Sequence, residues 1–212
     1  MATRSSASPR RARARRGEGP RLREEILAAA TRLLAQTNDA EAVSIRAVAE
    51  AVGVTPPSIY LHFADKTELI FAVCEEQFRQ LDAEMAAAEA GVADPLEALR
   101  RRGQAYVRFG LSNAEAYRVL FMYKDQVPAN VGEEYLYRSQ TFNHLVESVQ
   151  RCLDAGVLRP GDPLQISIGL WVLVHGITSL LLAAPAFPWP HDPEELVDRL
   201  VDDHLQGLLP RS

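Results

Sequence analysis

Apolar residues recur three or four positions apart along most of the chain, which is the spacing of helices that bury one face. No segment shows the strict alternation of apolar and polar residues that is typical of a half-buried β-strand. We therefore expect an all-α protein with short connecting loops. Helices are predicted over residues 21–36, 45–52, 56–63, 66–90, 95–110, 113–123, 132–155 and 163–184, and from residue 193 onward.

The segment 44–66 has the pattern of two short helices joined by a tight turn. Ser44 is a good N-cap, and Gly53 stands where the first helix must end, because glycine adopts a positive φ without steric cost. Thr55 is placed to cap the second helix, whose first position, Pro56, has no N–H to leave unpaired. DNA-binding proteins use this arrangement to place one helix in the major groove. The alternative is plain packing, since helix-turn-helix geometry also occurs in other all-α proteins.

The second of these helices has an inner and an outer face. Ile59 and Phe63 are one turn apart and are expected to face the core. The side chains left to point outward are Ser58, Tyr60, Leu61 and His62. A short helix that carries hydroxyls, a phenol and an imidazole fits contact with the groove and with phosphates.

The next helix offers a phosphate site at its start. Asp65 is predicted to cap this helix, with Glu68 as its capping-box partner. Lys66 lies in the first turn, beside the exposed N-terminus of the helix. The lysine and the helix end together could hold one phosphate.

Three stretches follow one another in the N-terminal third of the chain: RLREEILAAATRLLAQ, SIRAVAEAVGVTPPSIYLHF and DKTELI. Together they resemble the DNA-binding domain of the tetracycline-repressor (TetR) family of bacterial transcription regulators, over residues 21–70. The family's signature is matched at Gly53, Val54, Ser58, Ile59, Tyr60, His62, Phe63 and Lys66. The resemblance implies a three-helix DNA-binding domain at this end of the chain.

Matched position by position, the resemblance also implies roles for individual residues. Base contacts are implied for Pro57, Ser58 and Leu61. Phosphate contacts are implied for Thr55, Tyr60, His62 and Lys66. Arg46, at the start of the preceding helix, matches a position that can reach a base edge. Pro57 departs from the polar residue or glycine common in the family, which favours apolar contact there, for example with a thymine methyl group.

A second motif lies in the C-terminal part of the chain. The run WVLVHG at residues 171–176, followed by ITSLLL, resembles the C-terminal domain of a TetR subfamily named for its Trp-His-Gly motif. The resemblance implies a helical-bundle domain for effector sensing and dimerisation. We predict a disordered Arg-rich tail over residues 1–20, a helix-turn-helix DNA-binding domain over 21–67, and a ligand-binding and dimerisation domain over 68–212.

Residues 168–187 form a run of twenty positions without a formal charge, long enough to span a bilayer. His175, other polar residues and acidic flanks favour a buried core helix instead, and we predict no membrane contact. Apolar residues all round this helix imply burial on two sides, one of them against a second subunit. We therefore expect a homodimer formed through the last two helices, as a four-helix interface. The final helix would contribute Leu196, Val197, Leu200 and Val201.

The net charge of −5 is distributed unevenly. Residues 1–23 hold eight Arg and one Glu, whereas the remaining 189 residues carry a net charge of −12. A basic end on an acidic body suits a chain that presents only that end to a polyanion. The tail either adds phosphate or minor-groove contacts or is a solvated leader with no specific role.

The sequence favours recognition over catalysis. It contains no G-x-S-x-G motif, no phosphate-binding glycine loop and no H-E-x-x-H motif. None of its five histidines stands at a metal-ligand spacing from another histidine or a cysteine. We predict no catalytic residue, no metal and no cofactor. Cys74 and Cys152 are expected to be buried thiols in a reducing cytosol.

An effector pocket is predicted between the helices of the C-terminal domain. A largely apolar lining would suit a hydrophobic or aromatic small molecule. The candidate residues are Phe78, Tyr106, Phe109, Tyr117, Phe121, Phe142, Trp171 and His175. Ordinary core packing is the alternative for each aromatic residue. The buried imidazole of His175 needs a partner, which is either an internal hydroxyl or the effector.

These features predict a ligand-responsive transcriptional regulator, most often a repressor, that works in the cytoplasm at the nucleoid. A homodimer would set two recognition helices about 34–36 Å apart and read a palindromic operator in double-stranded DNA. An effector would shift the population away from the DNA-competent form. Two alternatives remain: an architectural DNA-binding protein without an effector, and an enzyme on the same helical frame.

Overall fold

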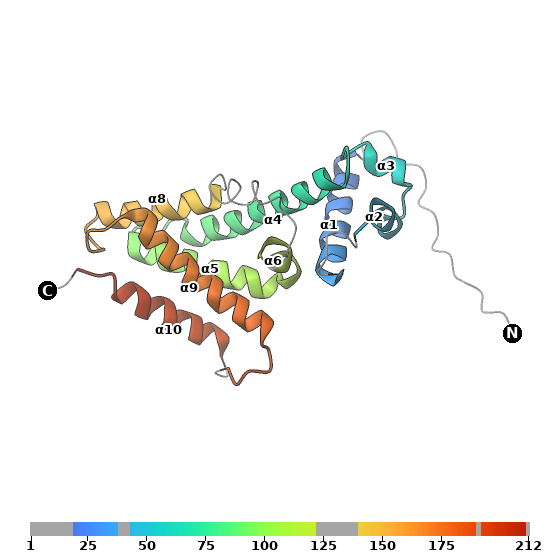
Figure 1. Cartoon of the computed structure of the whole chain (residues 1–212). Helices are drawn as coiled ribbons and strands as arrows, with labels where there is room; N and C mark the ends of the chain where they lie inside the picture. Colours follow the sequence, from blue (N-terminus) through green and yellow to red (C-terminus); the bar gives the residue numbers. More distant parts are fainter. Residues whose placement is uncertain (1–18, 38–42, 122–139, 190–191, 211–212) are drawn as a thin grey trace. The chain divides into compact units, whose positions relative to one another are not determined.

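The computed structural model describes residues 19–37, 43–121, 140–189 and 192–210 (Figure 1). Every regular element in these ranges is an α-helix, which confirms the all-α class. The helices are α1 (Gly19–Thr37), α2 (Ile45–Val52), α3 (Pro56–Tyr60), α4 (Lys66–Glu89), α5 (Pro95–Ser112), α6 (Ala114–Phe121), α8 (Gln140–Asp154), α9 (Pro163–Ala183) and α10 (Pro193–Gln206). Helix α8 is described from Gln140 onward, and the residues 132–139 predicted to belong to the same helix lie outside the described ranges.

The chain divides into two compact units. Among the described residues, those up to Glu76 and those from Arg118 to Phe121 form the first unit, and the others form the second. Both α4 and α6 contribute residues to each unit, so the two units share continuous helices. The functional boundary that we predict after residue 67 remains a prediction.

The core of the first unit fixes the orientation of α3. The side chains buried completely in this core are Ile26, Ala30, Leu34, Val48, Ile59 and Val73. Phe63 is 1% exposed, and the guanidinium carbon of Arg23 lies 5.1 Å from its ring centroid. Ile59 and Phe63 therefore face inward as predicted, and the opposite face of α3 must point to solvent.

Capping interactions define the ends of the short helices. The Ser44 hydroxyl accepts a hydrogen bond from a backbone N–H in the first turn of α2 at 3.1 Å, and Gly53 ends that helix with φ 78°. Asp65 accepts the backbone N–H of Glu68 at 2.8 Å, while the Glu68 carboxylate accepts the N–H of Ala64. These contacts confirm the predicted start and end of α2 and the predicted start of α4, whereas α3 ends at Tyr60 and is shorter than the predicted 56–63.

Helices α5 and α9 lie at the centre of the second unit, and α8 and α10 each pack against both (Figure 1). Gly110 allows α5 to approach α9 closely. A Cβ atom at Gly110 would lie 2.3 Å from Thr178 Cγ2 and 2.9 Å from Tyr117 Cδ2. A side chain at this position would therefore force the two helices apart.

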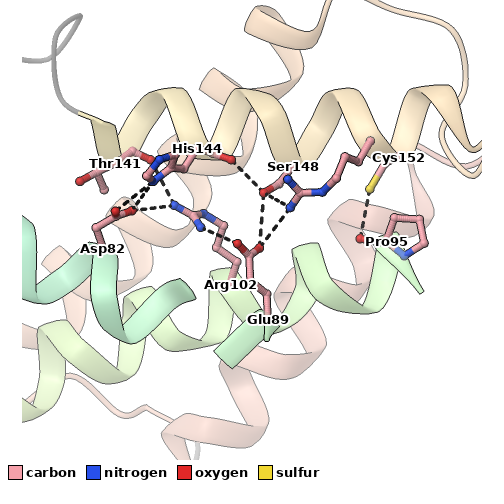
Figure 2. Close-up of polar contacts among 9 residues, drawn as sticks. Asp82, Glu89, Pro95, Arg102, Thr141, His144, Ser148 and Cys152 are labelled. Atoms are coloured by element: carbon pink, nitrogen blue, oxygen red, sulfur yellow. Dashed lines mark hydrogen bonds and ion pairs between the residues drawn. The ribbon is translucent and has the colours of Figure 1, made fainter. Parts of the chain in front are cut away.

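A buried arginine links three helices of the second unit (Figure 2). Arg102 on α5 is 2% exposed, and its guanidinium donates to Asp82 and to Glu89, at 3.1 Å each. Both carboxylates belong to α4, and the same guanidinium donates to the backbone carbonyl of Thr141 on α8 at 3.3 Å. A charge so far from solvent is tolerated because opposite charges and a carbonyl surround it.

Side chains of α8 complete this ion-pair network (Figure 2). His144 Nδ1 lies 2.9 Å from an Asp82 oxygen, and the Ser148 hydroxyl lies 3.4 Å from a Glu89 oxygen. Arg151 donates to Ser148 at 2.9 Å and lies 3.5 Å from Glu89. The network ties α4 to α5 and α8 at two points one heptad apart on α4.

Candidate DNA-binding surface and effector site

The start of α3 differs in detail from the prediction. Thr55 occupies the N-cap position but makes no side-chain cap hydrogen bond. Pro56 and Pro57 fill the first two helical positions and have no N–H to offer, and the Ser58 N–H is already bonded to the Thr55 carbonyl at 2.8 Å. The Thr55 hydroxyl pairs instead with the Ser58 hydroxyl at 3.1 Å.

The outer face of α3 is open to solvent. Leu61 is 83% exposed and Tyr60 is 54% exposed, although both are large side chains that proteins usually cover. Thr55 and Pro57 are exposed as well, and Ser58 and His62 are half-buried. Six of the residues for which the sequence predicts DNA contact therefore lie on α3 or directly beside it, with Thr55 as its N-cap, Leu61 as its C-cap and His62 next in the chain.

Two further residues of the predicted set lie on neighbouring helices. Arg46 is exposed on α2, and Lys66 is half-buried at the first position of α4. All eight predicted DNA-contacting residues thus belong to the first unit. Their contacts with DNA remain a prediction.

The second unit contains a cluster of aromatic and polar side chains centred on His175. Its Nδ1 lies 2.8 Å from the Tyr117 hydroxyl and 3.1 Å from the Tyr106 hydroxyl. Ser179, one turn further along α9, places its hydroxyl 3.1 Å from that of Tyr117. The imidazole therefore has internal hydroxyl partners, which was one of the two predicted possibilities.

Aromatic rings extend this cluster. The His175 ring stacks on Tyr117 at 5.7 Å between centroids and lies 5.6 Å from Trp171. Trp171 in turn meets Phe142 of α8 edge to face at 6.0 Å. We call Tyr106, Tyr117, Phe142, Trp171, His175 and Ser179 the His175 cluster.

Burial keeps the polar members of the His175 cluster uncharged. Desolvation lowers the pKa of the His175 imidazole and raises the pKa of both the Tyr106 and the Tyr117 phenols. At neutral pH, the side chains of the cluster are therefore all neutral. Such a site suits an uncharged partner better than an ion.

The other predicted effector residues are placed differently. Phe109 is 1% exposed within α5, and Phe78 is half-buried on α4 of the second unit. Phe121 belongs to the first unit. Their roles in effector binding remain predictions. Ser179 was not predicted, although its spacing of four residues from His175 places both on one face of a helix.

Helix α9 has one buried and one uncovered face. It buries Ser167, Leu170, Val174, Ile177 and Thr178 within the second unit. Its exposed apolar side chains are Leu164 at 37%, Ile168 at 43%, Val172 at 61% and Leu180 at 56%. Among the described helices, α9 alone is long and apolar enough to cross a membrane by length and composition. Because one face of α9 forms part of the core, we interpret it as a core helix.

The contribution of α10 to this surface is smaller than predicted. Val197 is 4% exposed and Val201 is 3% exposed, because both turn toward their own unit. The Val201 side chain lies 3.9 Å from the point that a Cβ at Gly103 of α5 would occupy. Of the four predicted interface residues of α10, Leu196 and Leu200 are half-buried and therefore partly open to solvent.

Both cysteines of the chain lie within the described ranges, Cys74 on α4 and Cys152 on α8. Cys74 and Cys152 are free and buried, as predicted, and burial raises the pKa of each thiol to about 11. Both are therefore protonated and unreactive at neutral pH. No group of three His, Cys, Asp or Glu side chains in the described residues is placed to hold a metal ion.

An all-α chain with an exposed helix-turn-helix and a separate helical unit has the architecture of a DNA-binding transcription regulator. Two family models match the sequence. "Bacterial regulatory proteins, tetR family" matches residues 26–73, and "Tetracyclin repressor-like, C-terminal domain" matches residues 99–204, which is half of the chain. The chain therefore belongs to the tetR family of bacterial transcription regulators, and the Trp-His-Gly motif lies within the C-terminal match.

Solved structures share this fold. A protein of unknown function from Rhodococcus sp. RHA1 is 26% identical, with a TM-score of 0.71, covering 89% of this chain and 96% of that one. A TetR family transcription regulator from Marinobacter aquaeolei VT8 is 19% identical, with a TM-score of 0.71 and coverage of 90% and 96%. The fatty acid degradation regulator from Bacillus halodurans is 15% identical, with a TM-score of 0.76 and coverage of 87% and 98%. No curated protein matches the sequence significantly.

Proposed function

We propose that this chain is a repressor that binds a palindromic operator as a homodimer and leaves it when a small-molecule effector binds. The observation that carries the DNA-binding part is the outer face of α3. Ile59 and Phe63 anchor that helix in the core, while Tyr60 and Leu61 stand in solvent on the other side. A rigid scaffold that exposes large side chains in this way is typical of a binding surface.

The uncovered face of α9 supports the homodimer. Four exposed apolar side chains follow one another along a single helix, and a soluble protein gains free energy by covering such a stripe. A second copy of the chain presents the same stripe, so a two-fold axis would bury both at once. Leu196 and Leu200 of α10 would lie at the edge of this interface.

The His175 cluster is our proposed effector site. Its members come from α5, α6, α8 and α9, so a molecule that binds among them would change the packing of several helices. Neutral hydroxyls and an imidazole among aromatic rings favour an uncharged, largely apolar effector. Because α4 contributes residues to both units, we infer that it transmits the change to α3. A screen of small molecules for release of the selected operator would identify the effector.

Replacing Tyr60 tests the proposed DNA-binding surface. We expect Tyr60→Ala to weaken operator binding about 30-fold or more, because a dimer loses two phosphate hydrogen bonds of about 1 kcal/mol each. The operator is first selected from a random DNA pool, and affinity is then measured by fluorescence anisotropy at constant salt.

A second variant and a second measurement give the controls. Tyr60→Phe removes only the hydroxyl, so its operator affinity separates the contribution of the hydrogen bond from that of the ring. Sedimentation velocity shows whether each variant is still a dimer. Because Tyr60 is exposed, both variants should remain dimeric. Loss of the dimer together with DNA binding would show that Tyr60 has a structural role instead.

The two alternatives make different predictions. An architectural protein would bind DNA without sequence preference and would respond to no small molecule. An enzyme on this frame would show turnover by the second unit. Selective, effector-sensitive binding at the nucleoid is the outcome that we expect.

A further inference from the structure

We propose that the base pairs beneath α3 are recognised through the 5-methyl groups of thymines, which contact Leu61 and Pro57. This inference rests on the proposed function, since it assumes that the outer face of α3 enters the major groove. It goes further because it names the chemical group on the DNA that the protein selects.

The geometry of α3 places two apolar residues at its outermost line. Successive residues of an α-helix are rotated by about 100°. The helix ends at Tyr60, but Leu61 keeps a right-handed helical conformation, and the N–H groups of His62 and Phe63 both donate to the Ile59 carbonyl, so the turn continues to Phe63. The buried Ile59 and Phe63 define the inward direction. On this rotation, Pro57 and Leu61 project in the opposite direction, which agrees with the 83% exposure of Leu61 and the exposed position of Pro57.

The hydrogen-bonding side chains lie on the flanks of this apolar line. Tyr60 falls on one side of it, and Ser58 and His62 fall on the other. A helix that enters the major groove presents its outermost line to the base edges and its flanks to the phosphate backbones. Tyr60 and His62 are therefore placed for phosphates, and the apolar line is placed for bases. Ser58 lies nearest to the apolar line, which is compatible with the base contact that the resemblance implies for it.

The chemistry of the apolar line selects one kind of base edge. A leucine side chain neither donates nor accepts a hydrogen bond, and Pro57 lacks even a backbone N–H. The nearest hydroxyls, on Thr55 and Ser58, pair with each other at 3.1 Å. On the major-groove edges of the bases, the thymine methyl is the apolar group. A thymine opposite Leu61 or Pro57 would therefore be preferred over the other bases.

Replacing thymidine by deoxyuridine in the selected operator tests this inference, because that change removes only the methyl group. Each thymine is replaced in turn, symmetrically in both half-sites. We expect at least one position at which the wild-type protein binds about 15-fold more weakly, since each lost methyl contact reduces affinity about fourfold. Leu61→Ala and Pro57→Ala should each abolish the sensitivity at one position. Tyr60→Phe, the matched control on the flank, should retain the preference at every position.

The outcomes separate this inference from the proposed function. Selective operator binding with unchanged affinity for every deoxyuridine operator would overturn the thymine inference alone. A Leu61→Ala, Pro57→Ala double variant that keeps the full preference would overturn it as well. Absence of any sequence-selective DNA binding by the wild-type protein would overturn the proposed function and this inference together.

Discussion

Replacing Arg102 by alanine is expected to lower the free energy of unfolding by about 3–5 kcal/mol. The guanidinium is 2% exposed, whereas the side chains of Asp82 and Glu89 are each 18% exposed. Removing the arginine leaves the carboxylates of Asp82 and Glu89 partly desolvated, without their main partner and without a positive charge to offset their mutual repulsion. It also opens a cavity between the helices. Urea unfolding at a fixed protein concentration measures the change, because dimerisation contributes to the apparent stability.

The neighbouring arginine provides a matched control. Arg101 pairs with Glu97 on the surface of α5, and its side chain is 48% exposed. Arg101→Ala should therefore cost no more than about 0.5 kcal/mol. A triple variant, Arg102→Met with Asp82→Asn and Glu89→Gln, removes the charges together and should recover much of the loss. Equal effects of Arg101→Ala and Arg102→Ala would contradict the structural role of the buried network.

Placing a charge on the uncovered face of α9 is expected to have the second large effect. Val172 is 61% exposed and lies among the exposed apolar residues of that helix. In a homodimer, Val172→Glu would bury two carboxylates in an apolar interface without partners. We expect the dimer dissociation constant to rise at least about 100-fold, which corresponds to about 3 kcal/mol. Sedimentation velocity over a range of concentrations measures this constant.

Operator affinity should fall in parallel, because a monomer binds one half-site without the advantage of the second. Ala86→Glu adds the same charge at an exposed position of α4 and serves as the control. This control should leave both the dimer and operator affinity essentially unchanged. A Val172→Glu protein that remains as strong a dimer as the wild type would show that α9 does not form the interface.

The features that the sequence predicts correctly depend on interactions within a few residues. Ser44 caps the next turn, Gly53 adopts a positive φ, and Asp65 binds an N–H three residues on. The alternation of buried Ile59 and Phe63 with exposed Tyr60 also follows from helix periodicity alone. The fold class and the exposed face of α3 could therefore be predicted from local patterns.

The features that the sequence does not predict depend on contacts between distant residues. Arg102 meets Asp82 and Glu89 across 20 and 13 positions, and His144 meets Asp82 across 62 positions. The spacing of seven residues between the two acids was the available signal, but it does not identify the arginine. The burial of Val197 and Val201 depends likewise on which neighbour α10 packs against. A helix shows in its sequence that it has an apolar face but not what covers that face.

The most direct test of the account is to find which DNA bases lie next to α3. An iron–EDTA cleavage reagent attached to a Leu61→Cys protein cuts DNA near residue 61, and the native thiols should not compete, because both are buried with pKa values near 11. At saturating protein we expect two clusters of cuts, related by two-fold symmetry and centred about 10 base pairs apart. A single cluster, uniform cutting, or a pattern unchanged when the reagent is moved to Ala86→Cys would contradict the claim that a symmetric pair of α3 helices reads the operator.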